Sequence, residues 1–386
     1  MVRSTYVHVP FCRHRCGYCN FNLVANRNDL IDPFIEAIES EIAGCLQSPR
    51  AMDTIYLGGG TPSHLQPEQL KQLLAVIRRW LIPATSAEIT CEMNPLDCTS
   101  ERLQILKDHG VNRISLGGQS FSDAKLRILE RDHSGQQLGE AIKECSRLFD
   151  NISLDLIFAA PGETESDWKR DVELASQLTC ISHLSTYGLT VERGSAFFGR
   201  AQRQEIHEVD SDTQHDMYCH VIDSLTAQAW EHYEVSSFAR DGTRSRHNET
   251  YWLGNPWWAF GPGAACYLPI RSQDSPAERA SFLRRTNHGS TTTYIRRVRD
   301  GQSPIQEWDL VGLEQHLRER FVFGMRRLEG VCLEELSREW NAPFRDLLEP
   351  KLTQYIQDGY FDEREGRVSL TRRGLLISDS LWPDFL

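Results

Sequence analysis

The sequence has no apolar run of membrane-spanning length and no charged-then-apolar leader at its N-terminus. A transmembrane helix needs about 20 consecutive apolar residues, and a secretory leader places a basic stretch before an apolar one. Met1 is followed almost at once by the main cysteine motif of the chain, which leaves no room for a cleaved targeting segment. We therefore expect a cytoplasmic protein without a transmembrane segment.

Basic residues are also fewer than acidic ones. The 386 residues include 42 Lys and Arg against 54 Asp and Glu, which gives a net charge of −12. This balance argues against broad binding to nucleic acids or to anionic membranes. We expect no nucleic-acid partner, and any anionic ligand would have to be held by local basic groups.

A disulfide framework is not indicated either, because the cysteines are odd in number and mostly scattered. Of eleven cysteines, eight are scattered along the sequence outside the main motif: Cys45, Cys91, Cys98, Cys145, Cys180, Cys219, Cys266 and Cys332. In a chain of this size we expect reduced thiols, most of them small buried residues.

The remaining three cysteines are concentrated in one loop. Cys12, Cys16 and Cys19 directly follow an expected strand over residues 5–10, and thiolates this close suit a soft metal centre. A structural zinc site closes with four ligands, and no matching pair follows at finger-like spacing. An iron–sulfur cubane also usually takes four thiolates, so three would leave one iron open. The alternatives are a zinc site with a distant fourth ligand, or three unrelated thiols.

The first half of the chain alternates strand-like and helix-like segments, with no internal repeat. The six expected strands cover residues 5–10, 54–57, 88–92, 112–116, 152–159 and 183–189. This alternation is typical of parallel βα units. Because six units are fewer than a closed barrel needs, we expect an α/β fold with a partial, open (β/α)6 barrel. Sites in such barrels form at the C-terminal ends of the strands.

The second half is expected to be less regular. It contains a helix over 205–230, a strand over 233–238, and an aromatic stretch over 244–263, in which glycine and proline predict no regular element. Helices over 313–328, 333–340 and 344–358, a hairpin over 360–370 and a last helix from Thr371 predict a small C-terminal helical, winged-helix-like domain. The acidic character of that domain favours a packing or partner module. We place the domain limits at 1–205, 206–300 and 301–386.

Polar and glycine residues gather at the ends of the expected strands. Gly58-Gly59-Gly60-Thr61 follows the second strand, where glycine lets backbone approach a ligand closely; the alternative is a simple tight turn. Glu92 and Asp155 lie in apolar strands, where a carboxylate is costly unless it meets a partner. Gln119 and Arg131 are similar candidates, and Arg131 suits a carboxylate ligand. Each alone is more often part of a structural ion pair, but together they favour a cofactor site.

Several motifs carry a resemblance to a known family. They are Tyr6-Val-His-Val-Pro-Phe-Cys12, Gly58-Gly-Gly-Thr-Pro62, Glu92-Met-Asn-Pro95, Gly118-Gln-Ser-Phe121, Asp155-Leu-Ile-Phe158 and Tyr187-Gly-Leu189. With these motifs and the cysteine spacing, the chain resembles the radical S-adenosylmethionine (SAM) family of oxygen-independent coproporphyrinogen III oxidases over nearly its whole length. Within that family it is most similar to the haem chaperone branch.

The resemblance implies a 4Fe–4S cluster on Cys12, Cys16 and Cys19, with SAM on the open iron. It implies SAM contacts from Tyr6, Tyr18, Gly59, Gly60, Thr61, Glu92, Gln119, Arg131 and Asp155. It also implies an electron donor for the cluster, haem as a ligand, a haem-accepting protein as partner, and a possible homodimer.

Two features favour the chaperone branch over the oxidase. The oxidase has a further cysteine where this chain has Phe21, and a longer N-terminal arm. The chaperone branch carries His-Asn-x-x-Tyr, which His247-Asn248-Glu-Thr-Tyr251 fits. We expect His247 to ligate haem with Tyr251 beside it; the alternative is an ordinary structural histidine. The alternative function is the oxidase reaction, a SAM-cleaving oxidation of a porphyrinogen.

Two positions depart from the pattern of the family. Ala265-Cys266 stands where relatives often have His-Gly, and Met93 stands where they usually have a small residue. Neither position touches the cysteine motif. Cys266 is a soft side chain and is therefore an alternative haem ligand.

Overall fold

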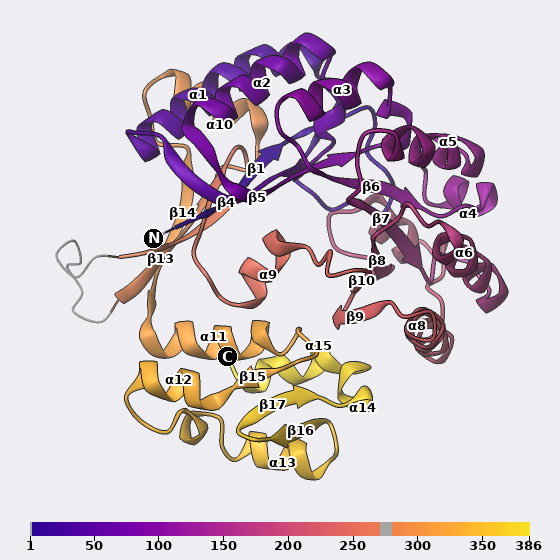
Figure 1. Cartoon of the computed structure of the whole chain (residues 1–386), viewed down its shortest axis with the longest axis vertical. Helices are drawn as coiled ribbons and strands as arrows, with labels where there is room; N and C mark the ends of the chain where they lie inside the picture. Colours follow the sequence, from indigo (N-terminus) through magenta and orange to yellow (C-terminus); the bar gives the residue numbers. More distant parts are fainter. Residues whose placement is uncertain (1, 271–279) are drawn as a thin grey trace.

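The computed structural model describes residues 2–270 and 280–386. Its centre is an open twelve-stranded sheet with the strand order β14-β13-β12-β11-β1-β4-β5-β6-β7-β8-β10-β9. The sheet is curved, with the early helices on its outer face and α9 on its concave side (Figure 1).

Six neighbouring strands of this sheet run parallel and form the partial barrel. They are β1 (Ser4–Val9), β4 (Arg50–Gly59), β5 (Leu81–Met93), β6 (Arg113–Gln119), β7 (Ile152–Phe158) and β8 (His183–Gly188). The helices that follow them are α1 (Ile31–Leu46), α2 (Pro67–Trp80), α3 (Ser100–Asp108), α4 (Asp123–Ile128), α5 (Gly135–Ser146), α6 (Glu165–Gln177) and α7 (Ala196–Gln202). The prediction of an open (β/α)6 barrel is confirmed.

Local signals in the sequence explain where several helices begin. The Thr99 hydroxyl accepts a hydrogen bond from the Arg102 amide and caps α3. Ser134 and Thr164 form capping boxes at the starts of α5 and α6, which satisfy amide groups that a helix leaves unpaired. The apolar face of α2 then packs against the sheet through Leu70, Leu73, Leu74, Val76 and Ile77.

Two predicted elements near the end of the barrel are wrong in their bounds. The helix expected over 205–230 is α8 (Ser211–Thr226), because the Asp210 side chain caps it and sets its start. The single strand expected over 233–238 is a hairpin of β9 (Glu231–Glu234) and β10 (Ser237–Ala239), which continues the sheet antiparallel to β8. The apolar pattern runs through the turn, so it does not reveal the break.

The aromatic stretch over 244–263 is regular, contrary to expectation. It forms α9 (Arg246–Trp252), capped by Ser245, and β11 (Trp257–Phe260), which pairs parallel with β1. Aromatic residues suit a strand, but the pairing with β1 joins segments about 250 residues apart and is not visible locally. This arrangement places α9 inside the curve of the sheet (Figure 1).

The sheet then continues antiparallel from β11. Its last strands are β12 (Ala265–Pro269), β13 (Ala280–Asn287) and β14 (Ile305–Gly312), with α10 (Thr291–Arg299) between the last two. Because β14 belongs to the main sheet, the sheet reaches Gly312. The domain limit predicted at 301 therefore lies before the last strand of the sheet, and the division of the chain into domains stays a prediction.

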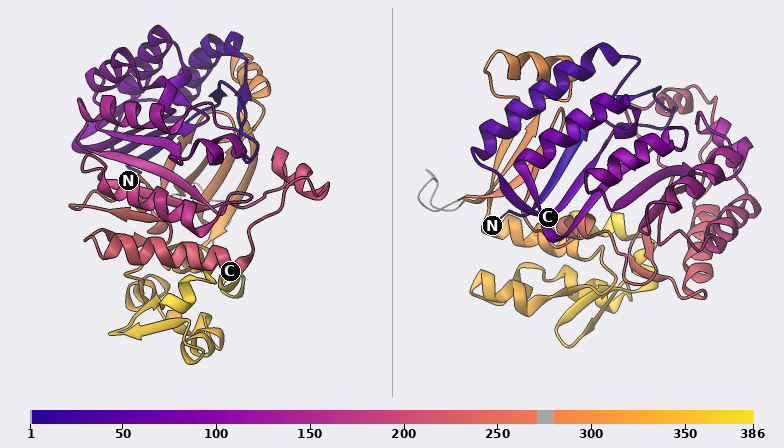
Figure 2. Two further views of the ribbon diagram at one scale, coloured as in Figure 1. Left: turned by 90° about the vertical axis from the view of Figure 1, so that its right-hand side faces the viewer. Right: turned by 45° about the horizontal axis from the view of Figure 1, so that its top comes forward.

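The C-terminal domain has the predicted mix of helices and a hairpin. It contains α11 (Leu313–Gly324), α12 (Leu333–Trp340), α13 (Lys351–Gln357), α14 (Arg372–Leu375), α15 (Ser378–Leu381) and a small sheet of β15 (Val331–Cys332), β16 (Phe361–Arg364) and β17 (Arg367–Leu370). Two views show it below the main sheet (Figure 2), where α11 contacts α9. Within the described ranges, no helix combines the length and apolar character needed to cross a membrane.

A buried carboxylate joins the first helix to the end of the sheet. Glu41 of α1 accepts hydrogen bonds from the Gly261 amide (2.9 Å), the Tyr294 hydroxyl (2.6 Å) and the Asn287 side-chain amide (2.6 Å). Burial raises the pKa of Glu41 to about 7, although these three donors oppose the shift. The contact fixes β13 and α10 against the barrel wall.

We predict that Glu41→Ala lowers the free energy of unfolding by about 3 kcal/mol, because three buried donors lose their acceptor and each unsatisfied group costs about 1–3 kcal/mol. Urea unfolding followed by tryptophan fluorescence measures this. Glu36→Ala, on the exposed face of the same helix, is the matched control and should change stability by less than about 0.5 kcal/mol. Equal effects of the two substitutions would contradict the role given to Glu41.

Candidate functional site

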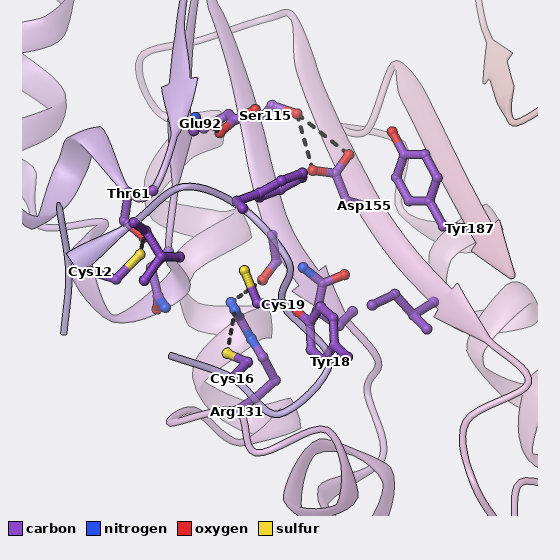
Figure 3. A pocket seen from close by; sticks show the side chains of 18 of the residues that line it. Cys12, Cys16, Tyr18, Cys19, Thr61, Glu92, Ser115, Arg131, Asp155 and Tyr187 are labelled. Atoms are coloured by element: carbon purple, nitrogen blue, oxygen red, sulfur yellow. Dashed lines mark hydrogen bonds between the residues drawn. The ribbon is translucent and has the colours of Figure 1, made fainter. Parts of the chain in front are cut away.

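A cavity of about 620 Å³ lies at the C-terminal ends of the parallel strands. Most residues predicted from the sequence line it: Cys12, Cys16, Tyr18, Cys19, Gly59, Gly60, Thr61, Glu92, Gln119, Arg131 and Asp155. The cysteines lie on one side of the cavity, and Glu92 and Asp155 lie along the strands (Figure 3). The fold therefore brings together residues that are up to about 140 positions apart.

The three cysteine thiols are free and have different neighbours. Cys12 Sγ is 3.2 Å from the Thr61 hydroxyl, and Cys16 Sγ accepts a hydrogen bond from Arg131 Nη1 at 3.6 Å. Cys19 follows one turn after Cys16, and its amide donates to the Cys16 carbonyl at 3.0 Å. All three cysteines line the same cavity, each with its own hydrogen-bond neighbours (Figure 3).

This arrangement fits an iron–sulfur cubane better than a single metal ion. In the described part of the chain, no group of three or more His, Cys, Asp or Glu residues is placed to hold one metal ion. A structural zinc site needs four ligands around one point. A cubane takes its thiolates on different irons, so separated sulfurs that face one cavity suit it. The residues present fit a cluster with three protein ligands.

The cysteines differ in how readily they lose a proton. Burial raises the pKa of the Cys12 thiol to about 12. Burial acts in the same direction on Cys16, but hydrogen bonding from His14 and the charge of Arg131 outweigh it and lower the pKa of Cys16. Burial also raises the pKa of the Cys19 thiol. Because metal ligands must be thiolates, binding of a cluster here would release protons from both Cys12 and Cys19.

The glycine run at the end of β4 makes room for Glu92. A Cβ on Gly58 would lie 2.7 Å from the Glu92 carboxyl group. Gly59 has a φ of +106°, which disfavours other residues, and its amide donates to Glu92 Oε2 at 3.0 Å. The Tyr56 hydroxyl donates to Glu92 Oε1 at 2.8 Å. The carboxylate is therefore fixed on the cavity wall by two donors.

The surroundings of Glu92 in the barrel shift its protonation. Removal from water raises the pKa of Glu92 to about 7, and the hydrogen bond from Tyr56 only partly opposes this. A group with a pKa near neutrality on a cavity wall is typical of ligand-binding sites. A bound cationic or N–H-rich group would favour the ionised form of Glu92.

The next two strands carry Gln119, at the end of β6, and Asp155, within β7. The Ser115 hydroxyl donates to Asp155 at 3.2 Å, and removal from water raises the pKa of Asp155. Gln119 ends β6 with a φ of 63°, a left-handed conformation that costs a non-glycine residue about 1–3 kcal/mol. Such strain at a cavity is characteristic of residues that position a side chain for a ligand.

Arg131 connects the cysteine loop to the strand ends. Its Nη2 donates to the Gly117 carbonyl at 2.7 Å, and its Nη1 donates to Cys16 Sγ. Its Nε is buried without a hydrogen-bond partner among the described residues. A buried donor without a partner is usually matched by water or a ligand, so Arg131 fits a role in anion binding.

Three predicted residues do not line the cavity: Tyr6, His247 and Tyr251. They lie behind the cavity wall formed by Tyr56, whose ring stacks on His247 at 5.0 Å between centroids. The Tyr6 hydroxyl contacts His8 Nδ1 at 3.0 Å, and the Tyr6 ring lies 6.1 Å from the Tyr56 ring.

His247 is enclosed in the core, with both ring nitrogens in hydrogen bonds. The residue is only 1% exposed. Its Nδ1 lies 2.9 Å from the Thr54 hydroxyl, and its Nε2 lies 2.7 Å from the Tyr251 hydroxyl. Burial lowers the pKa of His247 to about 3, so the ring is neutral. Haem ligation by His247 stays a prediction, and it would require the ring to give up one of these bonds. Asn248, the next residue, does line the cavity.

Two other groups near this segment are also engaged. Arg244 is paired with Glu231 and Glu249, and therefore is not a free cation for a ligand. Cys266 lies buried in β12, where Arg285 Nε donates to its sulfur at 3.5 Å. Cys266 does not line the cavity, whereas Met93 does.

The sequence reasoning missed several polar residues on the inner face of the strands. Tyr56, Arg113, Ser115 and Ser185 line the cavity, and Tyr187 does so as well, although it was noted only as part of a motif. The signal was present, because polar residues alternate with apolar ones on strand after strand, as in Arg113-Ile-Ser115. In a barrel strand, alternate residues point into the barrel.

Comparisons with known proteins agree with this geometry. Residues 6–175 match the radical SAM superfamily, and residues 311–377 match the HemN C-terminal domain. Among solved structures, coproporphyrinogen III oxidase (HemN) from Escherichia coli, described as a radical SAM enzyme, superimposes with a TM-score of 0.83. The match covers 100% of this chain and 90% of that one at 19% identity, so it establishes the fold.

Curated relatives are similar over the full length. The chain is 32% identical to the heme chaperone HemW of Bacillus subtilis, with 100% of this chain and 99% of that protein covered. It is 34% identical to heme chaperone HemW of Mycobacterium tuberculosis, with 98% and 93% covered. It is also 32% identical to radical S-adenosyl methionine domain-containing protein 1, mitochondrial, of Danio rerio, with 99% and 86% covered.

Membership of the radical SAM superfamily implies a 4Fe–4S cluster and SAM, and the three thiols and the polar wall of the cavity fit both. With full-length identity above 30% to several members, the chain belongs to the HemW family of radical SAM proteins.

Proposed function

We propose that this protein is a haem chaperone that carries a 4Fe–4S cluster and SAM, binds haem and passes it to a haem-requiring acceptor protein. The observation that carries the proposal is a single cavity with three free thiols and the Glu92 carboxylate, in a chain similar to HemW proteins along its whole length. An electron donor that reduces the cluster, a cytoplasmic location and a possible homodimer belong to the same proposal.

The residues of the cavity have distinct roles in this proposal. Cys12, Cys16 and Cys19 would hold the cluster. Glu92 would accept hydrogen bonds from the amino group of SAM, together with backbone oxygens of the glycine run, and Arg131 would pair with the SAM carboxylate. The remaining contacts would come from Tyr18, Thr61, Gln119 and Asp155, which line the cavity, whereas Tyr6 lies behind the cavity wall and would first have to reach the ligand. When bound and reduced, the cluster supplies one electron to SAM.

The proposed haem site lies outside the residues that line the cavity. The His-Asn-x-x-Tyr motif of the family indicates His247 and Tyr251 as the haem-binding residues. A neutral imidazole is a suitable axial ligand for haem iron. Because His247 Nε2 is bonded to the Tyr251 hydroxyl, ligation would exchange that bond for an iron bond. Haem binding at another residue, such as Cys266, is the alternative within the same function.

The rival function is the oxidation of coproporphyrinogen III. The fold similarity to HemN is compatible with it. Phe21 argues against it, because phenylalanine stands where the oxidases carry a further cysteine. Phe21 lines the cavity and is 66% exposed. The full-length relatives named as chaperones support the first proposal.

We predict that Cys12→Ala, Cys16→Ala and Cys19→Ala each abolish cluster assembly, because no fourth thiol lines the cavity in the described residues to replace the lost ligand. Iron and sulfide analysis after anaerobic reconstitution measures this. Cys45→Ala, at an exposed position of α1, is the matched control and should retain a full cluster. A triple variant that still assembles a SAM-responsive cluster would contradict the assignment.

We predict that SAM affinity falls in acid with the protonation of Glu92. The carboxylate is ionised above its pKa of about 7, so affinity should be level above that pH and should decline by up to roughly tenfold per pH unit well below it. Equilibrium dialysis of the reconstituted protein measures this, with cluster content checked at each pH. Glu92→Gln should bind weakly at every pH; a level profile for the wild type across neutrality would contradict the role of Glu92.

We predict that the reconstituted protein binds haem and does not decarboxylate coproporphyrinogen, even when reduced and loaded with SAM. The Soret band and co-elution of haem on gel filtration measure the first part, and porphyrin product analysis measures the second. Formation of protoporphyrinogen over many turnovers would overturn the chaperone proposal.

The same haem-binding measurement on the His247→Ala variant tests whether His247 is the axial ligand of the haem iron. A changed Soret band and lower haem occupancy would support His247. Unchanged haem occupancy and spectra would remove His247 as the ligand while leaving haem binding intact, and Cys266→Ala would then be the next variant.

A further inference from the structure

Arg113 is a buried cation in the wall of the cavity that the roles above do not use. It begins β6, belongs to the residues that line the cavity, and is only 2% exposed. Its Nε is buried and has no hydrogen-bond partner among the described residues. Burying an arginine without a direct partner is costly, so its place in the barrel calls for a reason.

The neighbouring strands supply that reason. β6 lies between β5, which carries Glu92, and β7, which carries Asp155. Ser115 pairs in register with Glu92 and donates a hydrogen bond to Asp155. Arg113 is two residues before Ser115 and points to the same side of the strand. The Arg113 side chain therefore starts two residues deeper in the barrel than the level of Glu92, on the strand between the two that carry the carboxylates, and it reaches the cavity.

The two histidines on this side of the barrel are neutral. His183 is bonded to the Ser153 and Tyr233 hydroxyls, and His247 is bonded to the Thr54 and Tyr251 hydroxyls. Burial lowers the pKa of both imidazoles far below neutrality. The titratable and charged groups around Glu92 and Asp155 are Tyr6, Tyr56, Arg113, Arg131, His183, Tyr187, His247 and Tyr251.

Of these groups, only the two arginines carry positive charge. Arg131 is already engaged by Cys16 and the Gly117 carbonyl. Charges act over several ångströms in a poorly solvated interior. Arg113 can therefore compensate both carboxylates without touching either one.

We propose that Arg113 is a positioning residue whose charge favours the ionised forms of Glu92 and Asp155, so that their oxygens are free to accept hydrogen bonds from SAM. A direct ion pair would occupy the oxygens that the ligand needs. A guanidinium that is close but unbonded stabilises the charge and leaves those acceptors open. Burial raises the pKa of both carboxyl groups, and Arg113 opposes that shift in each.

This inference rests on the proposed SAM site and is tested by the pH dependence of SAM binding. Arg113→Met and Arg113→Gln remove the charge, Arg113→Lys retains it, and Arg127→Met, at an exposed position of α4, is the control. SAM affinity of the cluster-loaded proteins is measured by equilibrium dialysis from about pH 6 to pH 9, a range that brackets the titration of Glu92.

In the variants without the charge, the midpoint of the loss of SAM affinity in acid should shift to higher pH by at least one unit. Affinity should be at least about fivefold weaker than wild type at neutral pH, where Glu92 of the wild type is itself only half ionised, and should recover toward the wild-type value in alkali. Arg113→Lys and Arg127→Met should keep the wild-type midpoint. If Arg113→Met does not fold, Arg113→Gln against Arg113→Lys gives the same comparison.

Two outcomes would overturn the inference. One is an unchanged profile in the charge-removing variants, and the other is an equal loss of affinity at every pH, which a merely structural role would produce. Failure of the wild type itself to bind SAM would instead overturn the proposed function, so the two failures are distinguishable.

Discussion

The burial of carboxylates inside the barrel is the constraint on which the site depends. Taking an ion out of water costs several kcal/mol unless other groups replace the lost hydration. Here the Tyr56 hydroxyl and the Gly59 amide serve Glu92, and the Ser115 hydroxyl serves Asp155. Gly58 has no side chain because the Glu92 carboxyl group fills that space. The compensation is incomplete, which leaves acceptors for a ligand on the cavity wall.

The parts of the site that the sequence predicted are those with local signals. The cysteine spacing and the glycine run are each read within a few residues, and the alternation of strands and helices places them at the same edge of the sheet. Glu92 and Asp155 stood out because a carboxylate in an apolar strand needs a partner. The capping residue Thr99 likewise fixed the start of α3.

The parts that the sequence did not predict depend on pairing between distant segments. β11 forms only because β1 is available as its partner, and β12 to β14 then add to it. Arg113 and Tyr56 were missed because their role comes from strands that lie beside them, not from neighbours in the chain. A search for polar residues at every second position of the barrel strands would have found both.

The position of His247 links the family motif to the cavity wall. Its ring stacks on Tyr56, and Tyr56 donates to Glu92, so the His247–Tyr251 pair lies directly behind the proposed SAM site. Any movement of α9 that frees His247 for a ligand would change the packing of Tyr56. The proposed haem ligand and the proposed SAM site therefore share a physical contact.

The central claim is that three thiolates hold a cluster and leave one iron open to SAM at the wall formed by Glu92. Mössbauer spectroscopy of protein reconstituted with 57Fe, recorded with and without SAM, tests it most directly. The account predicts that one iron of the cluster changes its isomer shift on addition of SAM while the others do not. Four equivalent irons that do not respond to SAM would contradict it.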